Sequence, residues 1–289
     1  MASNDSTLHF SAGSKTFLVG EYSVLFGGGA VVLVAPPNFE LKARKGKTDL
    51  IGVEKNSSAY SFYESHDFDG LSIEFFDPHN GAGGFGASSA QFATLYKLYL
   101  ELTRREFNVD SFLEEYKKLA GKKGVAPSGA DCVAQYFNRD VFFDSETNSV
   151  EKIDWKFPNL DFAIFKTGIK VATHSHLQEL SPIDVSELKN LTFGVKNSFR
   201  DLDEESLTKN TQAFFNALKD KGLVVDNTAK IVGDLLKIDG VKAAKGCGAL
   251  CADAIIAIFE KTMRANVEKA CDLLSTAGKF SPLLRKRGL

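Results

Sequence analysis

The sequence has few cysteines, no long apolar segment and no excess of charge of either sign. Its four cysteines are too few for a disulfide framework, and neither they nor the five histidines have the spacing of a zinc site. Reduced, mostly buried thiols are therefore expected. The longest apolar run, residues 30–37, stops at a double proline and is far shorter than the roughly 18 residues of a membrane span. With 35 basic against 37 acidic side chains, the chain lacks the basic excess of a general nucleic-acid binder.

The remaining composition is that of an ordinary globular protein. The chain has 289 residues, 44% of them hydrophobic and 25% charged, which is enough for one large domain or two smaller ones. Its first nine residues are polar and contain no apolar segment of the kind found in secretory signals. We therefore expect a cytoplasmic protein without membrane or nucleic-acid partners.

The apolar pattern predicts a mixture of strands and helices. Strands are expected at residues 16–19, 30–35, 71–75, 160–165 and 252–259. Helices are expected at residues 92–102, 110–120, 204–221, 228–236 and 263–274, with one more starting at Asp131. Asp110 or Ser111 is predicted as the N-cap of the second of these helices. A polar stretch ending at Trp155 and Pro158 marks the predicted boundary between domains of residues 1–157 and 158–289.

A glycine-rich loop before a predicted helix is suited to phosphate binding. It contains the small residues Gly83, Gly84, Gly86, Ser88 and Ser89. Small residues let backbone N–H groups approach phosphate oxygens, and the positive end of the helix dipole adds to the attraction. The two hydroxyls can donate to phosphate or bind Mg²⁺. The loop matches neither the P-loop nor the G-x-G-x-x-G pattern, and a flexible turn is the ordinary alternative.

Three further fragments carry candidate functional residues. Asp131 follows Pro-Ser-Gly-Ala at a predicted helix start, where a carboxylate serves either as a proton acceptor or as an N-cap. Lys15 precedes the first predicted strand, a position typical of an ordinary surface charge. Gly246 and Gly248 open the last apolar segment. Each fragment taken alone is compatible with a purely structural role.

In their order along the chain, these fragments resemble the motifs of the GHMP kinases, the family of galactokinase, homoserine kinase, mevalonate kinase and phosphomevalonate kinase. Residues 12–25 are similar to the family's P-G-K-x-x-L-x-G-E-[HY]-x-V-L motif, and residues 84–90 to the end of its P-x-x-x-G-L-G-S-S-A motif. Residues 127–131 match P-S-G-x-D, whereas residues 246–250 only partly match the third motif, G-A-G-G-G-x-C. The resemblance extends from residue 12 to about residue 260.

The resemblance implies a two-domain α+β fold with the active site in the cleft between the domains. The N-terminal half would resemble domain 2 of ribosomal protein S5, and the C-terminal half would be ferredoxin-like. ATP would lie against the glycine and serine loop. Asp131 would take the proton from the acceptor hydroxyl, and Lys15 would keep that carboxylate ionised and stabilise charge on the transferred phosphoryl group.

The resemblance also suggests metal and substrate ligands. Ser88 is the expected Mg²⁺ ligand if the loop carries one extra residue, with Ser89 as the alternative. The family's metal-binding glutamate would fall on Ala120, so either Glu114 or Glu115 replaces it or no glutamate does, and Glu115 is preferred. The expected substrate-binding residues, some of them in a segment similar to the K-V-x-x-S-T pattern of mevalonate kinases, are Glu21, Tyr22, Lys170, Thr173, His174, Gly246 and Gly248.

Several acceptors stay open. Residues 166–176 offer lysines and histidines but no arginine, which suits a carboxylate better than a phosphorylated substrate and favours mevalonate. Tyr22, in contrast, is more typical of phosphomevalonate kinases. Further alternatives are a catalytically silent nucleotide- or metabolite-binding protein, the related diphosphomevalonate decarboxylases and a sugar kinase. A monomer or a homodimer is expected.

Overall fold

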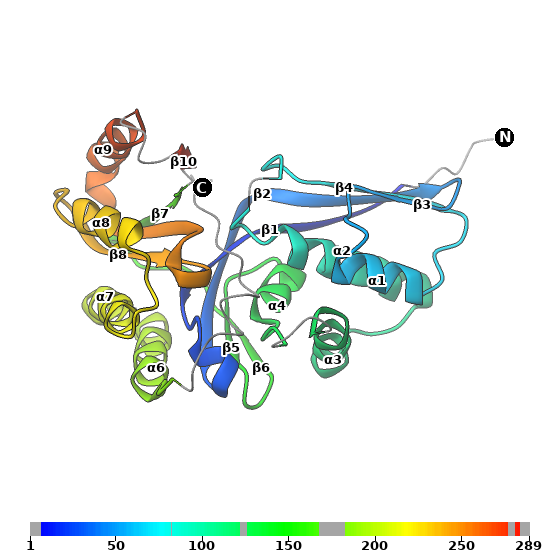
Figure 1. Cartoon of the computed structure of the whole chain (residues 1–289), viewed down its shortest axis with the longest axis horizontal. Helices are drawn as coiled ribbons and strands as arrows, with labels where there is room; N and C mark the ends of the chain where they lie inside the picture. Colours follow the sequence, from blue (N-terminus) through cyan, green and yellow to red (C-terminus); the bar gives the residue numbers. More distant parts are fainter. Residues whose placement is uncertain (1–6, 82, 122–125, 168–182, 277–280, 284–289) are drawn as a thin grey trace. The chain divides into compact units, whose positions relative to one another are not determined.

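The chain folds into two compact units that do not follow one another along the sequence. The computed structural model describes residues 7–81, 83–121, 126–167, 183–276 and 281–283. The first unit comprises Met1–Lys15 and Val34–Arg139, and the second comprises Thr16–Leu33 and Asp140–Leu289. Strands β1 (Leu8–Val19) and β2 (Gly29–Lys45) each carry residues of both units (Figure 1). The predicted boundary after residue 157 falls within the second unit, and the division into domains there stays a prediction.

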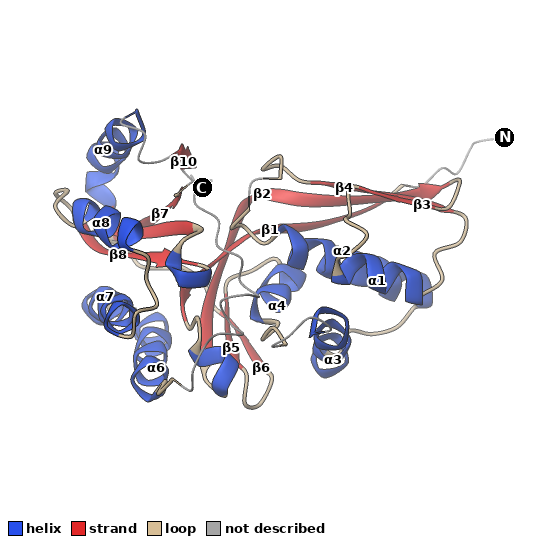
Figure 2. Cartoon of the chain, in the orientation of Figure 1, coloured by secondary structure: helices blue, strands red, loops and turns tan. Residues whose placement is uncertain are grey.

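The first unit combines a small sheet with a group of helices. The C-terminal part of β2 pairs antiparallel with β4 (Leu71–Phe76). Strand β4 in turn pairs in parallel with β3 (Asp49–Ile51). In Figure 2, helices α1 and α2 lie beside these strands. The helices of this unit are α1 (Ser58–Ser65), α2 (Ala87–Thr103), α3 (Val109–Ala120) and α4 (Ala130–Phe137). Their shared core is aromatic, with the ring of Phe92 5.3 Å from Phe62 and 5.5 Å from Phe112.

The second unit contains the start of β2 and a separate antiparallel sheet. The first residues of β2 pair with β5 (Val141–Asp144), which pairs with β6 (Ser149–Lys152). The other sheet has the order β10-β7-β9-β8, and its strands are β7 (Leu160–Lys166), β8 (Val241–Cys247), β9 (Ala254–Glu260) and β10 (Ser281–Leu283). The helices are α6 (Ser186–Asp201), α7 (Glu204–Asp220), α8 (Asp226–Leu235) and α9 (Arg264–Thr276), and the 3₁₀ helices are η1 (Ser23–Phe26), η3 (Ala249–Cys251) and η4 (Lys261–Met263).

Burial explains the apolar patterns of these strands. In β4, Ile73 and Phe75 are buried and alternate with exposed residues, as the period of two predicts. In β9, six consecutive residues are buried, so the strand has side chains packed on both faces and its sequence is continuously apolar. The predicted mixture of strands and helices is confirmed as an α+β fold.

Two details of the prediction need correction. Helix α3 is capped by Asn108, whose side chain accepts a hydrogen bond from the N–H of Ser111, so the helix starts before Asp110. Strand β2 does not stop at the double proline Pro36-Pro37 but continues to Lys45. The prolines lie between the stretches of β2 that pair with β5 and with β4, so their missing N–H groups interrupt neither of these two pairings.

The prediction also missed helices α1 and α6.

The three cysteines with described side chains, Cys132, Cys247 and Cys251, are buried free thiols, as expected. In the part of the chain that the structure describes, no helix has the length and apolar character needed to cross a membrane.

Candidate functional site

Lys15 and Asp131 form an ion pair at the start of α4. Lys15 Nζ lies 3.6 Å from Asp131 Oδ2, and the two side chains are 16% and 22% exposed, so solvent and a ligand can reach them. The other oxygen, Asp131 Oδ1, accepts a hydrogen bond from the N–H of Cys132 at 2.9 Å, which fixes the carboxylate in the first turn of the helix. The structure thus brings together the two residues predicted to be catalytic, although they are distant in sequence.

The segment before Lys15 is fastened to α4 through Gly13. The Gly13 N–H donates to Asn138 Oδ1 at 2.6 Å, and the Gly13 carbonyl accepts from Gln135 Nε2 at 2.8 Å. A Cβ atom on Gly13 would lie 2.6 Å from Val34 Cγ1, so only glycine allows this close approach. The position of Lys15 relative to α4 is therefore set by backbone contacts as well as by the ion pair.

His79, which the sequence interpretation missed, connects the same strand to the glycine loop. The Ser14 hydroxyl donates to the carbonyl of Pro37 at 2.8 Å and lies 2.6 Å from His79 Nε2. Since the only hydroxyl hydrogen goes to Pro37, His79 Nε2 must carry the proton and donate to Ser14 Oγ. The His79 ring stacks on Phe85 at 4.5 Å, and the Phe85 carbonyl accepts the N–H of Lys15 at 3.0 Å. A histidine two positions before the glycine-rich run was the available signal.

The glycine loop leaves the N-terminus of α2 without a side-chain cap. Gly84 and Gly86 have φ values of 96° and 85°, and Gly86 is the uncapped N-cap residue. A Cβ atom on Gly86 would lie 2.6 Å from Lys15 Cγ, so the loop passes directly beside Lys15. Ser88 is exposed, whereas Ser89 is buried and donates its hydroxyl to the carbonyl of Gly86 at 3.1 Å. Of the two serines, Ser88 is therefore the one that is accessible to a ligand. Gly83, also predicted to bind ATP, is exposed in the same loop.

Glu115 is not brought together with Ser88. Glu115 Oε1 lies 3.2 Å from His66 Nε2, and the His66 ring is 4.5 Å from the ring of Tyr99. Tyr99 lies eleven positions after Ser88 in α2, a separation of roughly 16 Å along the helix axis. Burial raises the pKa of Glu115, and the charge of His66 opposes this shift. The alternative, Glu114, is exposed on the same helix, and the described residues contain no cluster of three or more His, Cys, Asp or Glu side chains.

A second cluster, within the second unit, surrounds a buried lysine that the sequence interpretation did not select. Lys245 Nζ is 2.6 Å from Glu21 Oε1, and the side chains are 0% and 8% exposed. Lys245 also donates to the carbonyl of Phe17 at 3.3 Å. Burial disfavours the ammonium, but the electrostatic attraction of Cys247 and Glu21 outweighs it and raises the pKa of Lys245. Its position directly before Gly246 was the only local signal.

The other predicted substrate-binding residues of this unit lie around the same cluster. The Tyr22 hydroxyl accepts the N–H of Leu250 at 3.0 Å, and burial raises the pKa of Tyr22. A Cβ atom on Gly246 would lie 2.3 Å from the carbonyl oxygen of Cys251. Gly248 has a φ of 88°. These contacts show tight backbone packing. Lys170, Thr173 and His174 lie outside the described residues.

The turn that places Asp131 should not tolerate a side chain at Gly129. Gly129 has a φ of 81°, and a Cβ atom there would lie 2.4 Å from Leu113 Cδ2. We expect Gly129→Ala to lower the free energy of unfolding by about 2–4 kcal/mol, the sum of left-handed strain and the collision. Gly70→Ala is the matched control, because Gly70 has a φ of 75° with nothing within 4 Å. If urea denaturation gave equal losses of unfolding free energy for the two variants, Leu113 would have moved aside without cost.

Comparison with solved structures identifies the fold. Streptococcus pneumoniae phosphomevalonate kinase in complex with phosphomevalonate and AMPPNP aligns with a TM-score of 0.78 at 14% identity, covering 97% of this chain and 100% of that one. Lactococcus lactis galactokinase complexed with galactose aligns with a TM-score of 0.80 at 15% identity, covering 97% and 93%. The chain has the GHMP kinase fold.

The GHMP kinase fold is also found in Methanococcus jannaschii mevalonate kinase, which aligns with a TM-score of 0.71 at 15% identity and covers 98% of this chain and 97% of that one. No protein-family model and no curated protein matches the sequence. At these identities the similarity establishes the fold, and the chemistry has to be argued from the residues of this chain.

Proposed function

We propose that the protein is an ATP-dependent kinase that transfers the γ-phosphoryl group of ATP to a hydroxyl group of a small molecule. The observation that carries the proposal is the ion pair of Lys15 and Asp131, 3.6 Å apart, with the Gly86 turn directly beside Lys15. A carboxylate, an ammonium group and a phosphate-binding loop in one place are the components that phosphoryl transfer requires.

The residues of the loop fit the phosphates of ATP. Gly86 has no room for a side chain, and the first turn of α2 has no side-chain cap, so its N–H groups remain as donors for phosphate oxygens. The exposed Ser88 hydroxyl adds a further donor. Gly83, Gly84 and the buried Ser89 complete the proposed loop and hold its shape.

The residues fit Mg²⁺ only in part. Ser88 is exposed at the helix start and is suited to hold the ion, but Glu115 is occupied by His66 elsewhere in the unit. Mg²⁺ usually keeps several water molecules and binds phosphate oxygens, so one protein oxygen is compatible with its coordination. When bound, the ion would neutralise phosphate charge. We therefore propose Ser88 as its protein ligand and no longer Glu115.

In the proposed reaction, Asp131 accepts the proton of the acceptor hydroxyl through Oδ2. Its Oδ1 is held by the N–H of Cys132, which orients the carboxylate. Lys15 holds the carboxylate in place and provides positive charge for the phosphoryl group in transit. Because Gly13 and Ser14 fasten the strand before Lys15, this charge is preorganised rather than recruited on binding.

We propose mevalonate as the acceptor, with phosphomevalonate as the alternative. The choice rests on the sequence of residues 166–176, which offers lysines and histidines without arginine. Lys170, Thr173 and His174 would bind the acceptor directly, together with Gly246 and Gly248. Glu21 and Tyr22 are more than nine-tenths buried, so we assign them to positioning of the surrounding backbone.

The proposal is tested by following ADP release from ATP and Mg²⁺. The acceptors are mevalonate, phosphomevalonate, diphosphomevalonate, homoserine and galactose. Turnover with mevalonate and its loss in Asp131→Asn is the expected result. Turnover with phosphomevalonate alone would replace the proposed acceptor, and ATP binding without turnover of any acceptor would favour a catalytically silent binding protein.

A further inference from the structure

The first unit contains a cavity of about 520 Å³ at the C-terminal ends of α2 and α4. Both helices carry their proposed functional residues at the opposite ends, Ser88 in α2 and Asp131 in α4. Arg104 follows Ser88 by sixteen positions, which corresponds to roughly 24 Å at the rise of a helix. The cavity is therefore distinct from the glycine loop. Its lining consists of Phe10, Lys97, Leu100, Glu101, Arg104, Arg105, Phe107, Tyr136 and Phe137.

Three cations converge on this cavity. Lys97, Arg104 and Arg105 line it, and Arg105 also interacts electrostatically with the Glu115 carboxylate outside the lining. Glu101 is the single acid in the lining. A cavity with three positive charges and one negative charge attracts anions.

Lys97 is the most unusual of the three because it is half-buried, whereas the two arginines are exposed. Its Nζ donates to the carbonyl of Ser11 at 2.9 Å and lies 5.4 Å from the centre of the Tyr136 ring. A carbonyl and an aromatic ring compensate an ammonium group only partly. Burial accordingly lowers the pKa of Lys97 to about 8. A bound anion would supply the missing counter-charge.

The remaining lining is apolar and aromatic. Phe107 stacks on Tyr136 with ring centres 3.8 Å apart, and Phe137 meets Phe107 edge-on at 5.3 Å. Phe10 and Leu100 complete the apolar lining. Such a surface favours a ligand with an apolar or aromatic body in addition to its charge.

We propose that this cavity binds an organic phosphate with an aromatic or apolar body. Arg104 and Arg105 would hold the phosphate, because guanidinium groups bind phosphate oxygens through paired hydrogen bonds. Lys97 would supply a further charge at the base, and Phe10, Phe107 and Tyr136 would contact the body. Arg105 is already oriented by a 2.8 Å hydrogen bond to the Tyr99 hydroxyl.

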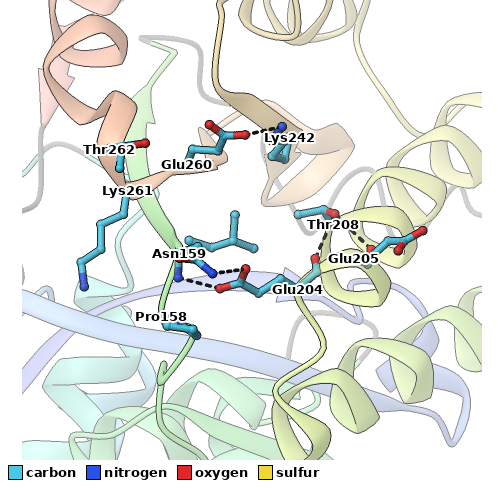
Figure 3. A pocket seen from close by; sticks show the side chains of 10 residues that line it. Pro158, Asn159, Glu204, Glu205, Thr208, Lys242, Glu260, Lys261 and Thr262 are labelled. Atoms are coloured by element: carbon cyan, nitrogen blue, oxygen red, sulfur yellow. Dashed lines mark hydrogen bonds and ion pairs between the residues drawn. The ribbon is translucent and has the colours of Figure 1, made fainter.

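A larger cavity in the second unit is less suited to binding an anion. It measures about 670 Å³ and contains none of the predicted site residues (Figure 3). Its Glu204 carboxylate accepts hydrogen bonds from the backbone N–H and the side-chain amide of Asn159 at 2.7 and 3.2 Å. Its Glu260 pairs with Lys242 at 2.5 Å. The lining holds three acids, Glu204, Glu205 and Glu260, against two lysines, Lys242 and Lys261, so this cavity does not favour an anion.

Titration of the whole chain with 1-naphthyl phosphate in a calorimeter tests the proposal. We expect saturable binding that weakens at least about tenfold in Arg104→Gln/Arg105→Gln, because the variant loses both guanidinium groups that bind the phosphate through charged hydrogen bonds. Both arginines are exposed, so the variant should fold. The control Lys55→Gln, at an exposed lysine outside the cavity, should bind normally.

A second variant separates this cavity from the proposed ATP site. Lys15→Met should leave the affinity for 1-naphthyl phosphate unchanged. Loss of binding in Lys15→Met, normal binding in the double arginine variant, or no binding at millimolar concentration would each overturn the proposal. Inorganic phosphate should bind at least about tenfold more weakly, and equal binding would contradict the role of the aromatic lining.

The pH dependence provides an independent measurement. Lys97 loses its proton as the pH rises through about 8, so affinity should fall between pH 7 and pH 9. A phosphate monoester is already doubly ionised in this range. Burial raises the pKa of Tyr136, the other titratable group beside Lys97, so its hydroxyl does not ionise in this range. A constant affinity between pH 7 and pH 9 would contradict contact with Lys97.

Discussion

Asp131→Asn is expected to reduce the rate of phosphoryl transfer by about 10²–10⁴ while the protein stays folded. A positioned base contributes a factor of this size, and an amide cannot accept the proton of the acceptor hydroxyl. Asparagine is nearly isosteric with aspartate, so its oxygen can still accept the N–H of Cys132. The loss should appear in kcat at saturating ATP and acceptor, because Asp131 acts on the proton that is transferred in the chemical step and not on substrate binding.

The matched control for this variant is Asp226→Asn. Asp226 also lies in the first turn of a helix, α8, so its substitution removes the same interaction with a helix dipole without touching the proposed site. Its kcat should stay within about twofold of the unmodified protein. Turnover of Asp131→Asn within about threefold of normal, in a variant with an unchanged melting temperature, would disprove the role of Asp131 as the base.

The second large effect is expected in Lys245→Met, which should lower the free energy of unfolding by about 3–5 kcal/mol. Removing one partner of a buried ion pair leaves the other charge uncompensated in a medium of low polarity. Here the remaining group is the Glu21 carboxylate, only 8% exposed. Its second oxygen, Oε2, already has no hydrogen-bond partner among the described residues. Nothing in the described surroundings can therefore replace the ammonium.

Two further variants show whether pairing or packing is responsible. Glu21→Leu/Lys245→Met removes both charges and should recover most of the loss, because apolar residues often replace a buried pair at little cost. Lys237→Met is the matched surface control: Lys237 lies 3.1 Å from Asp234 but is 77% exposed, so about 0–1 kcal/mol is expected. Urea denaturation measures the free energy of unfolding of the unmodified protein and of the three variants. Equal losses in Lys245→Met and the double variant would attribute the effect to packing.

The stabilisation by Lys245 should depend on pH in a defined direction. Its pKa is raised in the folded protein, so the folded state holds the proton more tightly than the unfolded chain does. The contribution is therefore fully present below the pKa of an unfolded lysine, near 10.4, and is lost only as the pH rises through the higher folded value. The stability difference between the unmodified protein and Lys245→Met should be constant from pH 7 to 9.

Short motifs and periodicity were sufficient for the strands and helices with a strong apolar pattern. The alternation at Ile73 and Phe75 predicted a half-buried strand, and a helix was predicted after the glycine loop, although α2 starts at Ala87 rather than at residue 92. Helix α6 was missed although its hydrophobic residues do face the core. Local patterns also misplaced the N-cap of α3, since Asn108, Asp110 and Ser111 are all good capping residues and only the backbone decides among them.

The residues with suitable chemistry, and their order along the chain, can be read from the sequence alone. Which of them come into contact depends on the tertiary fold. It placed Lys15 beside Asp131, engaged Glu115 with His66 away from Ser88, and joined Lys245 to Glu21 across 224 positions. Sequence spacing contains no information about such distant pairs, because the distance between two side chains depends on how strands and helices pack. The burial of Lys245, which makes its ion pair important for stability, is likewise a property of the packed chain.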